Sequence, residues 1–128
     1  MSDYTIKNLK SDVANAAEQF GVDGMEARFA RRDLELGNFG VSYQKLEPNF
    51  RQPFGHRHGE QEEAYVVVAG SGRVKVEDDV VDLEQWDAIR VPGSAARQFE
   101  SGPDGLEYVA IGAPQADDTE MLEGWWSN

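Results

Sequence analysis

The chain has two histidines, His56 and His58, and they stand two residues apart. On a β-strand, side chains at positions i and i+2 project from the same face, so both imidazoles can point at one centre. Glu63 follows after four residues and opens the apolar run 64–69, which ends at Gly70. Two imidazoles and a carboxylate are a ligand set that suits a divalent metal ion. We therefore predict a metal centre or ligand-binding pocket built on His56, His58 and Glu63.

Two further acidic residues, Glu60 and Glu62, lie beside Glu63. A slip of the strand register by one residue would exchange the side chain that faces the centre. The spacing to Gly70 favours Glu63. The alternative for the two histidines is an exposed pair on a loop rich in Gly and Glu, and their agreement with Glu63 and Gly70 outweighs it.

Composition limits the class of protein that carries this centre. The 128 residues leave room for one domain, and 40% of them are hydrophobic, which is enough for a core. The formal net charge of -12 disfavours nucleic acid and anionic membrane surfaces as partners. The absence of cysteine excludes disulfides and thiolate ligands. No apolar run is long enough to span a membrane and no export signal opens the chain, so we expect a cytoplasmic protein.

The elements that position the centre are predicted to be almost entirely strands. Apolar residues at helical spacing predict one short helix over Ser11 to Phe20, capped by Ser11 or Asp12. Beyond Gly24, short apolar runs are broken by Gly, Pro and Asp every 8 to 12 residues or so, which is typical of a sandwich or barrel. Turns are expected at Gly70-Ser71-Gly72 and at Asp78-Asp79. We predict strands at 26–31, 40–46, 53–58, 63–69, 73–77, 80–83, 88–91, 97–100 and 106–111.

The same pattern divides the chain into three parts. Residues 1–24 form an N-terminal segment with the short helix, and residues 25–113 form the barrel. Residues 114–128 form an acidic C-terminal tail that ends in Trp125 and Trp126. Two neighbouring indoles expose a large apolar surface if left in water, so we expect them to pack on the barrel or on a partner subunit.

The spacing His56-x-His58, four residues, Glu63, six residues, Gly70 resembles the first motif of the cupin superfamily, with Phe50 where that motif begins with Gly. Residues 85–99 resemble the second motif, with Arg97 in the place of its third metal-binding histidine. The resemblance covers about Gly40 to Ile111. It implies an all-β double-stranded β-helix (a jelly-roll or cupin barrel), a homodimer, and a divalent metal ion such as Fe, Mn, Ni or Zn.

Arg97 changes what this resemblance implies about the metal. A guanidinium has no lone pair and stays protonated, so it cannot act as a ligand. At about 4 Å from a divalent ion it would cost on the order of 8 kcal/mol at an effective dielectric near 20. In one alternative, Arg97 turns away or meets a bound anion, and His56, His58 and Glu63 hold the metal. In the other, Arg97 pairs with Glu63 and no metal is bound. The sequence leaves both open.

Either alternative predicts a small polar or anionic ligand in the barrel, because the guanidinium fork suits a carboxylate, phosphate or enolate. Tyr65 and Phe99 are the predicted ligand contacts beside Arg97, although aromatic residues on strands are more often core. One functional hypothesis is a metal-dependent oxidoreductase or isomerase. The alternative is a metal-free binding or sensing protein that does not turn its ligand over.

Overall fold

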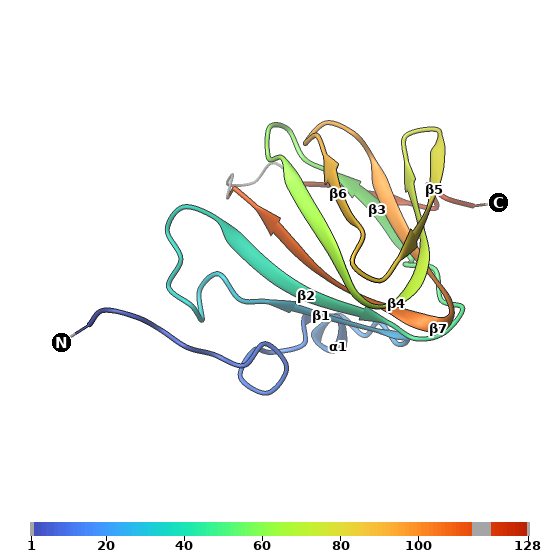
Figure 1. The fold of residues 1–128 in the computed structure, drawn as a ribbon. Coiled ribbons are helices and arrows are strands. Elements are labelled where there is room, and N and C mark those ends of the chain that lie inside the picture. The colour runs from blue at the N-terminus through green and yellow to red at the C-terminus, as the bar shows by residue number, and fades with distance from the viewer. Residues whose placement is uncertain (1, 114–118, 128) are drawn as a thin grey trace.

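The computed structural model describes residues 2–113 and 119–127. Apart from one short helix, the ordered elements are strands, as predicted (Figure 1). In chain order they are α1 (Ala16–Gln19), β1 (Met25–Phe29), β2 (Gly40–Leu46), β3 (Phe54–Arg57), β4 (Glu63–Val76), β5 (Asp79–Glu84), β6 (Ala88–Val91), β7 (Arg97–Gly112) and β8 (Glu120–Glu123).

Two long antiparallel strands, β4 and β7, organise the barrel and run side by side through it (Figure 1). Each carries two shorter strands on its free edge: β6 and β5 pair with successive halves of β4, while β2 and β3 pair with opposite ends of β7. The register of β4 on β7 shifts near its middle, between Val67 and Ala69 and again between Gly70 and Gly72. The strands therefore form two layers, β6-β4-β7-β2-β1 and β5-β4-β7-β3-β8, which is the predicted double-stranded β-helix.

The predicted turn at Gly70-Ser71-Gly72 is wrong, because the chain continues there as one bent strand. Gly70 has a φ of 75°, and a Cβ at this position would lie 2.1 Å from the carbonyl oxygen of Gly105. A Cβ at Gly72 would lie 2.2 Å from the carbonyl oxygen of Glu100. The glycines thus let β4 and β7 cross closely while both strands pass from one layer to the other.

The space between the two layers is filled by one hydrophobic cluster that takes side chains from both. At its centre Tyr65 packs edge-on against Phe99 with ring centroids 4.9 Å apart, and Phe99 stacks on Tyr108 at 4.3 Å. The hydroxyl of Tyr108 accepts a hydrogen bond from Gln52 and donates one to Gln44. These satisfied aromatic side chains form the floor on which the predicted centre lies.

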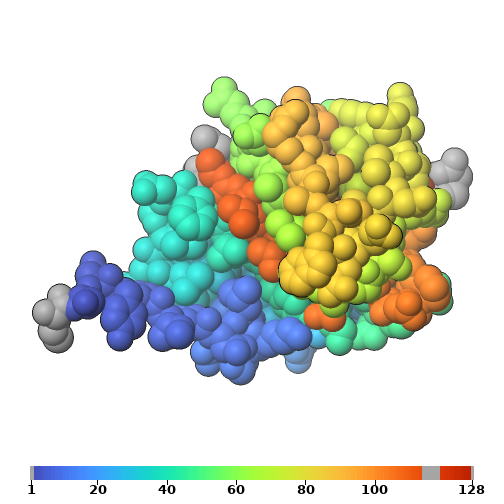
Figure 2. Space-filling view, in the orientation of Figure 1, coloured from blue at the N-terminus to red at the C-terminus, as the bar shows by residue number. Residues whose placement is uncertain are grey.

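The N-terminal helix is shorter than predicted and is capped by a different residue. The side chain of Asn15 accepts hydrogen bonds from the backbone nitrogens of Ala17 and Ala27, which fixes the helix start against β1. Residues 8–12 form a separate turn in which Asn8 and Asp12 accept bonds from nearby backbone nitrogens. Because Asp12 is used in that turn, it does not cap a helix. Figure 2 shows the N-terminal segment (blue) along the edge of the molecule, projecting past the strands.

Other assignments in the second half of the chain also differ from the predictions, and the predicted strands 97–100 and 106–111 form one continuous strand, β7. The tight turn lies at Glu77 and Asp78, with Glu77 at a φ of 50°, so β5 starts at Asp79 instead of Val80. Strand β8, which pairs with β3, was not predicted. The packing of the terminal indoles on the barrel is confirmed, because Trp126 is 5% exposed and lies under the guanidinium of Arg51. None of the helices in the described residues has the length and apolarity needed to cross a membrane.

Candidate functional site

Strand β3 places the two histidines at one end of the space between the layers. His56 is the direct cross-strand partner of Arg97 on β7, so their side chains lie on the same face. His58 follows the last residue of β3, and its backbone nitrogen donates to the carbonyl of Gly93 at 2.7 Å. The two imidazoles meet edge to face with centroids 5.0 Å apart.

Glu63, the first residue of β4, brings its carboxylate to the histidines from the other layer. Its Oε1 lies 3.4 Å from Nε2 of His56 and 3.2 Å from Nε2 of His58. One ligand atom from each of the three residues lies within 4.8 Å of the other two. The neighbouring Glu62 instead pairs with Arg90 at the surface. The structure therefore brings together the three residues singled out from their spacing.

The centre is accessible from one side. The side chain of His56 is 25% exposed, whereas those of His58 and Glu63 are 8% and 13% exposed. His56 is therefore the most solvent-accessible of the three side chains. The backbone beside the carboxylate is closely packed, because a Cβ at Gly112, the cross-strand neighbour of Glu63, would lie 2.9 Å from Nε2 of Gln61 and 3.0 Å from Cγ of Glu63.

Arg97 is completely buried and donates to four oxygens of the protein itself. Its Nη1 donates to the carbonyls of Gly93 at 3.1 Å and Ala95 at 2.7 Å, and its Nε donates to the hydroxyl of Tyr65 at 3.1 Å. Its Nη2 donates to Oε1 of Glu63, also at 3.1 Å. The ion pair required by the metal-free alternative is thus present. The two backbone carbonyls fix the guanidinium in this place, so it does not turn away from the centre.

The protonation states around the carboxylate follow from its neighbours. Burial raises the pKa of Glu63, but hydrogen bonds from His56, His58 and Tyr65 outweigh burial and hold the pKa well below its usual range. Burial and the nearby charge of Glu63 raise the pKa of Tyr65. At neutral pH the centre therefore holds an ionised carboxylate and a phenol that keeps its proton and donates it to Oε1 of Glu63.

The remaining predicted contact, Phe99, is 1% exposed and packs against the ring of Tyr65. It reaches the centre only through Tyr65. Tyr65 itself bridges Glu63 and Arg97, because its hydroxyl donates to the carboxylate and accepts from the guanidinium. Arg97, Tyr65 and Phe99 thus form a layer behind the carboxylate, which also faces the buried His58 and the partly exposed His56.

The donor set fits a divalent metal ion. Four groups face Oε1 of Glu63, although one carboxylate oxygen offers about two lone-pair sites. Tyr65 and Arg97 act there only as donors, and the two histidine nitrogens stand farther away than the 2.7–2.9 Å or so of charge-assisted bonds. Both Nε2 atoms already face the carboxylate and can offer a lone pair to a cation, and Oε2 of Glu63 retains a site for it.

Among the described residues, Thr119 and Gln61 also contact this centre, and neither contact was foreseen from the sequence. The Oγ1 of Thr119 lies 3.0 Å from Nδ1 of His58, and Nε2 of Gln61 lies 3.4 Å from Oε2 of Glu63. Gln61 stands two residues before Glu63, a spacing that can bring the two side chains together. Thr119 lies 61 residues from His58, and nothing in its local pattern marks it.

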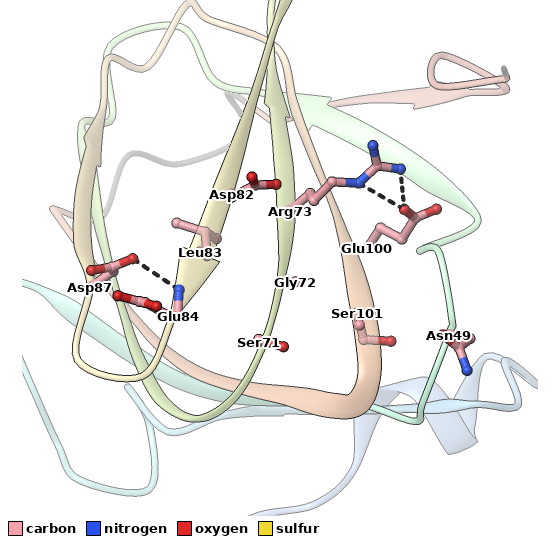
Figure 3. Close-up of a pocket in the computed structure, with 11 residues that line it drawn as sticks. Asn49, Ser71, Gly72, Arg73, Asp82, Leu83, Glu84, Asp87, Glu100 and Ser101 are labelled. Atoms are coloured by element: carbon pink, nitrogen blue, oxygen red, sulfur yellow. Dashed lines mark hydrogen bonds and ion pairs between the residues drawn. The ribbon is translucent and has the colours of Figure 1, made fainter.

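A hollow lies away from the histidines, where β4, β5 and β7 meet (Figure 3). Its wall carries the carboxylates of Asp82, Glu84 and Asp87, while Arg73 and Glu100 pair with each other across from them. Asp87 accepts a hydrogen bond from the backbone nitrogen of Glu84. Within the described residues the potential metal-ligand group is the one at His56, His58 and Glu63, so this groove is not a second candidate of that kind.

Comparison with solved structures identifies the fold. A cupin protein from Bacteroides fragilis superposes with a TM-score of 0.72 at 21% identity over 99% of this chain and 94% of that chain. Oxalate decarboxylase from Bacillus subtilis gives a TM-score of 0.78 at 21% identity over 95% of this chain. A sugar phosphate isomerase of the cupin superfamily from Silicibacter pomeroyi gives 0.66 at 19% identity, covering 79% of this chain and 77% of that chain.

These likenesses establish the cupin fold. This chain spans 33% of the length of the oxalate decarboxylase. No protein-family model and no curated protein matches the sequence. Because a fold of this kind hosts many activities, function has to be argued from the centre itself.

Proposed function

We propose that this cupin-fold chain binds a small anionic ligand at the open end of its barrel through a divalent metal ion held by His56, His58 and Glu63. The observation that carries the proposal is the convergence of both Nε2 atoms on one ionised carboxylate, at a partly exposed position. Imidazole and carboxylate ligands suit Fe, Mn, Ni and Zn. When bound, such an ion supplies open coordination positions and positive charge for an oxygen of the ligand.

Charge balance supports an anionic ligand. The charges of Glu63 and Arg97 cancel, so a divalent ion at the centre leaves a net charge of about +2 inside the barrel. The backbone carbonyls of Gly93 and Ala95 keep the guanidinium in place, and it therefore repels the ion until an anion enters. A carboxylate, phosphate or enolate would neutralise that charge. Oxalate and sugar phosphates, named for two proteins of this fold, are anions of this kind.

The reaction classes that fit this arrangement are oxidation and isomerisation. Within the chain, Tyr65 and Arg97 hold the Glu63 carboxylate ionised and fixed in orientation. His56, the more exposed histidine, lies where a ligand enters. A cytoplasmic protein that acts as a homodimer remains part of the proposal, with an interface other than Trp126, which is buried in its own chain.

A second candidate is a metal-free binding or sensing protein. The observation that favours it is the Arg97–Glu63 ion pair, in which the guanidinium supplies the positive charge that an ion would otherwise provide. His56 and His58 would then serve as hydrogen-bonding groups for a polar ligand.

Metal analysis of protein purified without a histidine tag separates the two candidates. We expect about one equivalent of a divalent metal in the wild type, and loss of the metal in His56→Ala and Glu63→Ala. Glu62→Ala is the matched control, since Glu62 stands next to Glu63 but pairs with Arg90 at the surface. Wild-type protein that contains no metal and takes up none from zinc, manganese, iron or nickel would overturn the metal proposal in favour of the second candidate.

A further inference from the structure

We propose that Thr119 is a positioning residue that holds the imidazole of His58 with its Nε2 aimed at the centre. The proposal rests on the proposed function, because it concerns the same ring. Thr119 Oγ1 lies 3.0 Å from Nδ1 of His58, while Nε2 of the same ring faces Glu63 Oε1 at 3.2 Å. The imidazole is thus held at both of its nitrogens, on opposite edges of the ring.

The register of β8 on β3 explains why Thr119 is in reach. The strands are antiparallel, and their paired residues run from Phe54 with Glu123 to Arg57 with Glu120. One further step places Thr119 opposite His58. Side chains directly opposite each other on antiparallel strands have Cβ atoms about 4.5–5.5 Å apart on the same face. The contact therefore follows from the strand pairing.

The C-terminal residues keep β8 in this register. Trp126 is 5% exposed, its backbone carbonyl accepts a hydrogen bond from Arg51 at 2.9 Å, and the guanidinium of Arg51 stacks 4.1 Å from its ring. Trp125 is covered by the ammonium of Lys75 at 4.5 Å. The chain is therefore anchored six and seven residues beyond Thr119, which fixes the backbone that carries the hydroxyl.

A hydroxyl suits this task because it can donate or accept. When Nε2 of His58 presents its lone pair to a cation, Nδ1 carries the proton and donates it to Thr119. When Nε2 carries the proton and donates to Glu63, the hydroxyl donates to Nδ1 instead. The ring keeps one orientation in both states. His56 differs, because among the described residues none forms a hydrogen bond with its Nδ1, and its side chain is 25% exposed.

Three variants test the proposal. Thr119→Val has nearly the same shape and lacks the hydroxyl, while Thr119→Ser restores it. Thr119 is exposed, so these changes leave the core intact. Thr5→Val is the matched control: Thr5 is the other threonine of the chain, and its hydroxyl donates to Glu35 at the surface.

The first readout is the ¹⁵N shifts of the His58 ring in metal-free protein, assigned with His56→Ala. We expect Thr119→Val to shift the His58 nitrogens and its tautomer balance, leaving those of His56 unchanged, and Thr119→Ser to restore the wild-type values. The second is zinc affinity by competition with a chelator. Here we expect about 10- to 100-fold weaker binding in Thr119→Val and wild-type binding in Thr5→Val.

His58 shifts in Thr119→Val that equal those of the wild type would overturn the role of Thr119. Wild-type zinc affinity in Thr119→Val would overturn it equally. If the wild type binds no zinc, the proposed metal function fails, but the shifts of the metal-free proteins still decide whether Thr119 positions the ring.

Discussion

The barrel contains two clusters built from the same three kinds of side chain, one between its layers and one on its outside. The inner cluster consists of Arg97, Glu63 and Tyr65. The outer cluster consists of Arg51, Arg73, Glu100 and Trp126, of which Arg73 and Glu100 line the groove of Figure 3. In each, a carboxylate pairs with a guanidinium, and an aromatic residue contacts the guanidinium, through the hydroxyl of Tyr65 in the inner cluster and through the ring of Trp126 in the outer one. The clusters differ in their exposure to water.

In the inner cluster the Arg97 side chain is 0% exposed and that of Glu63 is 13% exposed. In the outer cluster the side chains of Arg73 and Glu100 are 44% and 22% exposed. Water solvates a charge that loses its partner at the surface, whereas a buried charge left alone has no such compensation. Disruption of the inner ion pair is therefore expected to lower the free energy of unfolding severalfold more than disruption of the outer ion pair.

The largest expected effect is that of Arg97→Met, which leaves the ionised Glu63 buried without its cation. We expect the free energy of unfolding to fall by about 3–5 kcal/mol. Urea unfolding of metal-free protein measures it. Arg73→Met, which breaks the outer pair, is the matched control and should cost about 1 kcal/mol at most. Equal losses in the two variants would remove the distinction between the clusters.

The effect of zinc on the stability of Arg97→Met gives a second test of the inner cluster. In Arg97→Met a bound zinc ion would take over the compensation of Glu63 and would no longer meet a guanidinium. Zinc at about 100 times its dissociation constant should therefore restore about 2.7 kcal/mol of the lost stability. The midpoint of urea unfolding with and without zinc measures this. A variant that zinc does not stabilise would contradict metal binding at Glu63.

Trp126→Ala tests whether burial of the indole, and not the ion pair, stabilises the outer cluster. Trp126 is 5% exposed, and its removal should cost about 3 kcal/mol in thermal or urea unfolding. Trp86, which is 69% exposed, provides the control, because Trp86→Ala should change stability by about 0.5 kcal/mol or less. A loss in Trp126→Ala no greater than in Trp86→Ala would mean that the tail adds nothing to the barrel.

The dependence of stability on pH should also separate the two carboxylates. Glu63 and Glu100 both have a pKa below the ordinary value of 4.5, because hydrogen bonds to each outweigh its burial. Such a group stabilises the folded state above its unfolded pKa, and the contribution is lost as the pH falls through the folded value. Glu63→Gln should therefore flatten the loss of stability between about pH 5 and pH 2 more than Glu100→Gln does. Urea unfolding across this range is the measurement, and equal slopes would contradict the assignment.

The smallest effect is expected for Glu100→Gln at neutral pH. Its two guanidinium partners, Arg51 and Arg73, are partly exposed, and water replaces the lost contacts. We expect a change of about 1 kcal/mol or less in urea unfolding. A larger loss would show that the three charges act as a network, so that the outer cluster would resemble the inner one.

Much of the fold was predictable from local pattern. Strands Gly40–Leu46 and Ala88–Val91 have the predicted bounds, because period-two alternation or a short apolar run is bounded there by Gly, Asp or Pro. The bend at Gly70 was misread as a turn, since a glycine pair has the same local signature in both. Only the crossing of β7 at Gly105 and Glu100 distinguishes the two cases.

The prediction of the helix start was wrong and the last strand was missed, both for a related reason. Asn15 caps the helix because its side chain also binds Ala27 on β1, a contact that propensity does not reveal. Strand β8 is four residues long and largely exposed, so neither hydrophobic alternation nor length marked it. Its existence depends on the free edge of β3, which is a property of the assembled sheet.

The sequence by itself determined the chemistry available at the centre. Two histidines two residues apart and the spacing to Glu63 specify the ligand types, and Arg97 in place of a third histidine removes one ligand. These conclusions need only the alternation of side chains along a strand and the chemistry of each side chain.

Only the tertiary structure decided how these groups act on one another. The carbonyls of Gly93 and Ala95 hold the guanidinium of Arg97 against Glu63, and β8 brings Thr119 to His58 across 61 residues. Both contacts arise from turns and strand pairings between distant segments, and local sequence pattern carries no signal for them. Folding of the barrel thus fixes the guanidinium of Arg97 beside Glu63 and places the hydroxyl of Thr119 against the imidazole of His58.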